Sequence, residues 1–135
     1  MRHARGIDGA ELVAIFAGGC VGALARGLLT EALPSDPGQW PWATFAANLA
    51  GAALLGYVAT RLQERLPLSS YQRPLLGTGF CGALTTFSTL QLELLEMIDA
   101  RAWALAAGYV GASVVAGFAC VFVTTNLVRR VRPTT

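Results

Sequence analysis

The sequence has 135 residues, of which 54% are hydrophobic and 13% are charged. This composition excludes a disordered chain, and a net charge of +2 is too small to indicate nucleic acid or another acidic partner. Four long runs are almost free of charge, and a membrane-spanning helix needs about 20 mainly apolar residues. We therefore expect an all-α membrane protein, with residues 1–135 forming one domain of four transmembrane helices. The predicted spans cover residues 10–32, 41–62, 74–98 and 102–128.

The first predicted span combines small residues with a single charge. Gly18 and Gly22 form a small-xxx-small pair, which allows another helix to approach closely. Arg26 follows, and an arginine at the bilayer centre costs about 3 kcal/mol or more unless water reaches it. Two interpretations of Arg26 stay open. Its side chain either extends to the nearby membrane surface or faces a water-filled vestibule, where it would attract anions.

The second predicted span has one strong hydrogen-bonding group near its middle, Asn48, and Thr44 lies one turn earlier on the same face. A buried amide in lipid needs a partner. Asn48 therefore either bonds to a neighbouring helix or donates to an anion in a pore. We favour the second interpretation because of the residues in the next span.

The third predicted span is the functional centre of the sequence. It is uncharged from Pro74 to Leu92, yet three glycines weaken it as a helix and hydroxyl side chains compete for its backbone hydrogen bonds. Irregular backbone at membrane depth survives only where protein or a water-filled cavity surrounds it. A broken span exposes backbone groups that can hold ions. We therefore expect a broken third helix in an ion-handling protein.

The fourth predicted span carries Tyr109 and Ser113 four residues apart, and thus on one face. Tyr109 is either an interfacial ring or a pore residue, and Ser113 either bonds to its own backbone or joins a polar lane with Asn48. Eight of the ten arginines lie in the two termini and in the link between the second and third spans. Because positive charge gathers on the cytoplasmic side, we expect a multi-pass protein of the plasma (cell inner) membrane with both termini cytoplasmic.

The polar groups of these spans are better suited to contacting a small anion than to catalysing a reaction. The single histidine, His3, lies near the N-terminus, and no catalytic triad, carboxylate pair or metal-ligand cluster can be assembled, so we do not expect an enzyme. Hydroxyl and amide donors replace the water that a strongly hydrated anion sheds. The positive edge of the Phe87 ring can add to them. Because no fixed cation sits mid-membrane to trap the anion, rapid passage is favoured over tight binding.

Residues 82–89, Gly-Ala-Leu-Thr-Thr-Phe-Ser-Thr, followed by Glu93, resemble the signature of the Fluc (CrcB) fluoride ion channel family. Shorter motifs at 18–26, 48–56 and 109–113 are similar to the family as well, so the resemblance covers all four spans. It implies a channel that exports toxic cytoplasmic fluoride by passive electrodiffusion. It also implies a membrane-embedded dimer of two antiparallel four-helix subunits with two fluoride pores.

The resemblance also implies the roles of individual residues. Arg26 would stand in a vestibule, and the main-chain carbonyl groups of Gly82 and Thr85 would hold a structural sodium ion at the dimer centre. Leu90 departs from the family, which often has a second phenylalanine there, so part of the aromatic lining is missing. The implied anion pathway consists of Asn48, Phe87, Ser88, Thr89, Glu93, Tyr109 and Ser113.

Other assemblies and functions stay open at this point. The uneven arginine distribution favours one orientation, so a heterodimer with an oppositely oriented homologue is kept beside the homodimer. A small dual-topology proton-coupled multidrug exporter also has four spans, but it needs a carboxylate inside the first span. Only the ends of that span carry one, Glu11 and Glu31. A non-conducting accessory subunit of a heterodimeric channel is the third hypothesis.

Overall fold

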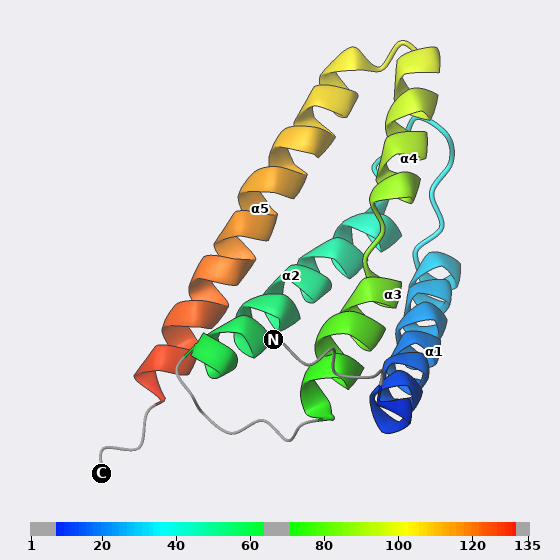
Figure 1. Cartoon of the computed structure of the whole chain (residues 1–135). Helices are drawn as coiled ribbons and strands as arrows, with labels where there is room; N and C mark the ends of the chain where they lie inside the picture. The colour runs from blue at the N-terminus through cyan, green and yellow to red at the C-terminus, as the bar shows by residue number, and fades with distance from the viewer. Residues whose placement is uncertain (1–7, 64–70, 132–135) are drawn as a thin grey trace, which may run out of the picture.

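The computed structural model describes residues 8–63 and 71–131, and every regular element in these two ranges is helical. Three helices are long: α1 (Gly9–Ala32), α2 (Trp42–Gln63) and α5 (Trp103–Arg130). Successive passes run antiparallel, so α1 begins at the end of the bundle where α5 ends (Figure 1). The part of the chain between α2 and α5 forms three shorter elements, η1 (Pro74–Cys81), α3 (Gly82–Leu84) and α4 (Phe87–Asp99).

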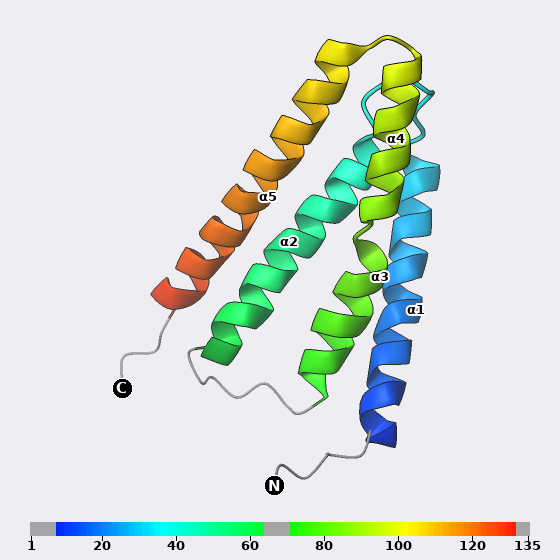
Figure 2. The same ribbon diagram turned by 45° about the horizontal axis from the view of Figure 1, so that its top comes forward.

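The helices lie side by side, and each has the same neighbours in both views of the structure (Figures 1 and 2). Helix α2 lies between α5 on one side and η1 with α3 on the other, and α1 packs against η1 and α3 (Figures 1 and 2). Helix α4 continues beyond α3 and packs against α5. Large side chains such as Phe16, Phe118 and Phe122 are exposed on α1 and α5. Contiguous apolar surface of this kind marks contact with lipid or with another subunit.

Within residues 8–63 and 71–131, three segments are long and apolar enough to cross a bilayer: α1, the Trp42–Arg61 part of α2, and α5. Their helices begin and end within two residues of the predicted spans 10–32, 41–62 and 102–128. The predicted span 74–98 differs from these three, because the chain there is divided among η1, α3 and α4.

Element η1 is a widened helix of the π type that begins at Pro74. Proline suits a first helical position because its missing N–H group would have no partner there anyway. Helices of this type are rare and are often found at functional sites. The glycines of η1 allow it to approach α1 directly.

Helix α1 packs directly against the backbone of η1. A side-chain Cβ added at Gly18 would collide with the carbonyl oxygen of Leu75. One added at Gly79 would collide with the carbonyl oxygen of Ile15 and lie 3.1 Å from the Cα of Gly18. The close helix approach predicted from Gly18 is therefore confirmed.

A tight turn between α4 and α5 sets these two helices against each other. Arg101 adopts a left-handed conformation with φ of 59°. Its N–H group donates to the carbonyl oxygen of Ile98 at 2.9 Å, and that of Ala102 donates to Met97 at 2.8 Å. These bonds satisfy the last carbonyl groups of α4. The turn brings the side chains of α4 opposite those of α5.

Candidate functional site

The site is built around a break in the backbone between α3 and α4. Helix α3 ends at Leu84, and the next two residues are extended, with φ and ψ of −78° and 150° at Thr85 and of −147° and 122° at Thr86. Helix α4 then begins at Phe87. A break of this kind removes backbone N–H and C=O groups from the helical hydrogen-bond pattern. In an apolar environment those groups need other partners.

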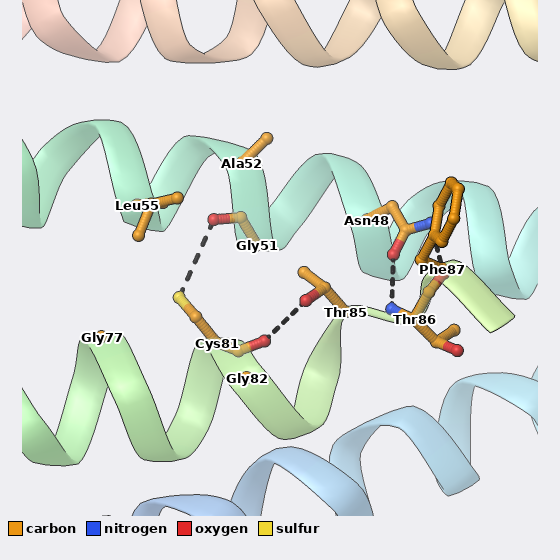
Figure 3. Close-up of a pocket in the computed structure, with 10 residues that line it drawn as sticks. All are labelled: Asn48, Gly51, Ala52, Leu55, Gly77, Cys81, Gly82, Thr85, Thr86 and Phe87. Atoms are coloured by element: carbon orange, nitrogen blue, oxygen red, sulfur yellow. Dashed lines mark hydrogen bonds between the residues drawn. The ribbon is translucent and has the colours of Figure 1, made fainter.

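The side chain of Asn48 on α2 supplies two of these partners. The backbone N–H of Thr86 donates to Oδ1 of Asn48 at 2.8 Å, and Nδ2 of Asn48 donates to the carbonyl oxygen of Thr86 at 3.1 Å (Figure 3). These contacts agree with the first of the two interpretations of Asn48, a hydrogen bond to a neighbouring segment of the chain. An amide group has two N–H hydrogens, and this pairing uses one. Donation of the other to an anion stays a prediction.

The hydroxyl of Thr86 joins the polar side chains at the start of α4. Its Oγ1 accepts from the backbone N–H of Thr89 at 3.2 Å and donates to Oγ1 of Thr89 at 2.9 Å, and it lies 3.3 Å from Oγ of Ser88. Thr86 is thus the N-cap of α4. The predicted residues Ser88 and Thr89 are both brought to this cap. Thr89 accepts in its pair, so its own hydroxyl hydrogen is not used there.

Two carbonyl oxygens beside the break lack the partners that a continuous helix would give them. The backbone N–H of Thr86, which would otherwise donate to Gly82 four residues earlier, is bound to Asn48. The N–H of Thr89 donates to Thr86 and not to the carbonyl oxygen of Thr85. Among the described residues, no hydrogen bond reaches the carbonyl oxygen of Gly82 or of Thr85. Both oxygens are therefore open acceptors.

An open groove of about 460 Å³ lies beside the break, between α2 and the η1–α3 segment. Asn48, Gly82 and Phe87 all line it, with the other residues labelled in Figure 3. The Phe87 side chain is 72% exposed, so its ring is not packed into this chain. A Cβ added at Gly51 would collide with Cγ2 of Thr85, so a larger residue at this position of α2 would require the Thr85 side chain to move.

A second polar cluster joins three helices on the α4 side of the break. The Glu93 carboxylate accepts hydrogen bonds from Oγ1 of Thr44 at 2.5 Å and from the Tyr109 hydroxyl at 2.8 Å. Tyr109 is fully buried, and its ring packs against Trp40 and Phe45 at centroid distances of 5.4 and 6.4 Å. The carboxylate is therefore held from two sides. The sequence analysis predicted that Glu93 and Tyr109 belong to the site. It did not predict the hydrogen bond between these two residues or the packing of Tyr109 against the two rings.

Two predicted residues take no part in these hydrogen-bonded clusters. Ser113 lies one turn after Tyr109, and its buried hydroxyl makes no hydrogen bond with any described residue. Arg26 is partly buried on α1, and no ion pair of its guanidinium is found among residues 8–63 and 71–131. The structure thus gathers Asn48, Ser88 and Thr89 around Thr86, and pairs Glu93 with Tyr109.

Removal of the Tyr109 hydroxyl tests the three-helix cluster. We expect Tyr109→Phe to lower the free energy of unfolding by about 1.5–3 kcal/mol, the usual contribution of a hydrogen bond to a charged group. Tyr57→Phe is the matched control, because the Tyr57 ring lies 5.9 Å from the Arg61 guanidinium and phenylalanine keeps that ring. Thermal unfolding of the purified protein in detergent measures both. Equal unfolding temperatures for the two variants would contradict the role assigned to the hydroxyl.

The helices and the site define a small multi-pass membrane protein with an irregular, hydroxyl-rich segment between its long apolar helices. Residues 13–125 match the model of the family described as "CrcB-like protein, Camphor Resistance (CrcB)". The chain belongs to this family, as its motifs indicated.

Similar proteins come from several bacteria. The "Fluoride-specific ion channel FluC 1" of Mycolicibacterium paratuberculosis is 58% identical over 125 residues, which cover 93% of this chain and 95% of the relative. The "Fluoride-specific ion channel FluC" of a Caulobacter species is 39% identical over 123 residues, covering 90% and 96%. "FluC 2" of Nocardia farcinica is 37% identical over 123 residues, covering 91% and 88%. The match therefore extends over nearly the whole of each chain.

Proposed function

We propose that this protein is a fluoride-selective ion channel that exports toxic cytoplasmic fluoride by passive electrodiffusion. The observation that carries the proposal is the break at Thr85–Thr86, lined with hydroxyl groups, in a chain whose relatives are named fluoride-specific ion channels. Fluoride is small and strongly hydrated, so it needs hydrogen-bond donors at each point where it loses water. The described residues of the site offer such donors.

The proposed pathway includes both clusters described above and three residues outside them, Phe87, Ser113 and Arg26. Asn48 has one amide hydrogen left over from its pairing with Thr86, and the buried Ser113 hydroxyl has no partner among the described residues. Both groups are therefore suited to meet a passing anion. Phe87 would present the positive edge of its ring, and Arg26 would raise the local anion concentration in a vestibule. The remaining proposed pathway residues are Ser88, Thr89, Glu93 and Tyr109.

A structural sodium ion is a further part of the proposal. Hard cations take oxygen ligands, including backbone carbonyl groups. The carbonyl oxygens of Gly82 and Thr85 accept no hydrogen bond from the described residues, so this donor set fits such an ion. When bound between two subunits, the ion would link them at their centre. The glycine at position 82 is exposed, which leaves its carbonyl accessible to a second chain.

The channel would be an antiparallel dimer in the plasma (cell inner) membrane, each subunit crossing it four times over residues 74–98 and the three long helices. The exposed Phe87 ring and the open groove beside the break support a second subunit there. Both termini would be cytoplasmic if one orientation dominates, because positively charged segments favour that side. Because an antiparallel homodimer needs both orientations, this uneven charge distribution favours a heterodimer with an oppositely oriented homologue, and the homodimer is kept beside it as the second proposed assembly.

The decisive experiment measures fluoride efflux from liposomes that contain only this purified chain. With potassium fluoride inside and valinomycin added, we expect rapid fluoride release and little chloride release from matched vesicles. Release of neither ion by a folded, membrane-inserted chain would contradict a homodimeric channel and favour an accessory subunit. Adding the homologous subunit then separates a heterodimer from a chain without conduction.

A proton-coupled exporter is less well supported. Glu11 and Glu31 lie in the first and last turns of α1 and are exposed, so they cannot exchange protons at mid-membrane. Uptake of a cationic dye driven by a proton gradient, without fluoride release, would favour the exporter.

A further inference from the structure

Thr86 lies outside the predicted anion pathway, yet it binds two residues that belong to it. It occupies the extended backbone between α3 and α4 and is buried, with 8% of its surface exposed. Its main chain bonds to Asn48 on α2 (Figure 3), and its side chain bonds to Thr89 on α4. Thr86 therefore connects two proposed anion donors that come from different helices.

The hydrogen-bonding groups of Thr86 are used within the chain. Its backbone N–H donates to Oδ1 of Asn48 at 2.8 Å, and its carbonyl oxygen accepts from Nδ2 of Asn48 at 3.1 Å. Its hydroxyl oxygen accepts from the N–H of Thr89 at 3.2 Å and donates its one hydrogen to Oγ1 of Thr89 at 2.9 Å. In the 3.3 Å contact with Ser88 the Thr86 oxygen can therefore only accept. No hydrogen of Thr86 is left to bind an anion.

The same bonds leave one donor free on each of the two neighbours. Asn48 binds Thr86 through its oxygen and one amide hydrogen, which fixes the plane of the amide and the direction of its second hydrogen. Thr89 receives the Thr86 hydrogen at its hydroxyl oxygen, and among the described residues no hydrogen bond uses the Thr89 hydroxyl hydrogen. Both free hydrogens belong to residues of the proposed pathway.

We propose that Thr86 is a positioning residue of the anion pathway, which holds the Asn48 amide and the Thr89 hydroxyl so that each keeps one hydrogen free for fluoride. Thr86 itself does not contact the anion. Donors that are already held in place need no reorganisation when the ion arrives. The inference rests on the proposed channel function and adds a residue to the same site.

The competing explanation is that the Thr86 hydroxyl serves only as the N-cap of α4. Capping requires an oxygen that accepts from a backbone N–H at the start of the helix, and it requires no hydrogen on that oxygen. Positioning of Thr89 also requires the hydroxyl hydrogen, which is donated to Thr89. Substitutions at position 86 can therefore separate the two roles.

Fluoride efflux from liposomes and thermal unfolding in detergent are measured for three variants of the full chain. Thr86→Val has a similar shape without the hydroxyl, so the unfolding temperature should fall and efflux should fall about tenfold, the effect of losing one hydrogen bond. Thr86→Ser keeps the hydroxyl and should restore both. Thr86→Asn supplies a good capping oxygen that carries no hydrogen. Its unfolding temperature should match that of the unmodified chain, while its efflux should stay low.

Thr125→Val is the matched control, because it also removes a hydroxyl from a pair of threonines. Oγ1 of Thr60 on α2 donates to Oγ1 of Thr125 on α5 at 3.1 Å. Thr60 lies more than three helical turns after Asn48 along α2, so this pair is remote from the break. We expect efflux from Thr125→Val vesicles to equal that of the unmodified chain.

Two results would overturn the positioning role alone. One is normal efflux from Thr86→Val vesicles beside normal efflux from the unmodified chain. The other is recovery of efflux together with stability in Thr86→Asn, which would leave Thr86 as a helix cap only. Thr86→Asn and Thr86→Ser give this comparison even if Thr86→Val fails to fold.

Failure of the proposed function itself gives a different result. If the unmodified chain conducts only with its homologous subunit, every variant is compared in that assembly. Absence of fluoride release from the unmodified chain, both alone and with that subunit, would contradict the channel function and the role of Thr86 together.

Discussion

Asn48→Asp is expected to abolish fluoride efflux while leaving a protein that still inserts into the membrane. Aspartate keeps an oxygen acceptor for the Thr86 N–H group but loses the amide donor to the Thr86 carbonyl oxygen. Its negative charge would then face that carbonyl oxygen and any passing anion. Two like charges 4 Å apart at an effective dielectric constant of 20 repel by about 4 kcal/mol, so we expect efflux to fall by at least about 100-fold.

A matched control for this substitution lies on α5. Asn126 also donates from Nδ2 to a backbone carbonyl oxygen, that of Phe122 at 2.9 Å, but this pair is exposed and local. Asn126→Asp removes the same type of bond and adds the same charge away from the break. We expect its efflux to stay close to that of the unmodified chain. Normal efflux from Asn48→Asp vesicles, with the protein amount verified, would contradict the place of Asn48 in the pathway.

The long helices were predictable because their determinants are local. Runs of apolar residues set the lengths of α1, α2 and α5, and charged or proline-rich segments set where they end. The low helix propensity of the third segment was predictable for the same reason, since its glycines and hydroxyl residues lie close together in sequence. The two residues at which the backbone is extended, and the π geometry of η1, were not predicted from the sequence.

The contacts that fix the site join residues far apart in sequence. The position of the break depends on Asn48, which lies 38 residues before Thr86. The Glu93 carboxylate depends on Thr44, 49 residues away. A single sequence shows which residues share one face of a helix. It does not show how that helix is rotated relative to its neighbours. For this reason Glu93 and Tyr109 were marked separately and their hydrogen bond was missed.

Gly18→Ala is expected to have the largest effect on stability. In an exposed helix interior the change from glycine to alanine stabilises a helix by about 1 kcal/mol. At Gly18 the added Cβ would collide with the carbonyl oxygen of Leu75 and lie 3.0 Å from the backbone nitrogen of Phe80. Backbone atoms cannot rotate away as a side chain can, so α1 must separate from η1. Overpacking of this kind costs about 1–3 kcal/mol or more, which reverses the sign of the substitution.

Gly27→Ala on the same helix gives the opposite expectation. Outside the local backbone of α1, no atom lies within 4 Å of a Cβ added at Gly27, so the helix propensity of alanine should dominate and the unfolding temperature should stay unchanged or rise. Thermal unfolding in detergent compares the two variants directly. Because α1 supports η1, and η1 leads into the Thr85–Thr86 break, we expect Gly18→Ala to lose efflux together with stability. Equal unfolding temperatures for both variants would show that α1 and η1 do not meet at Gly18, and the support of the break by α1 would then have to be abandoned.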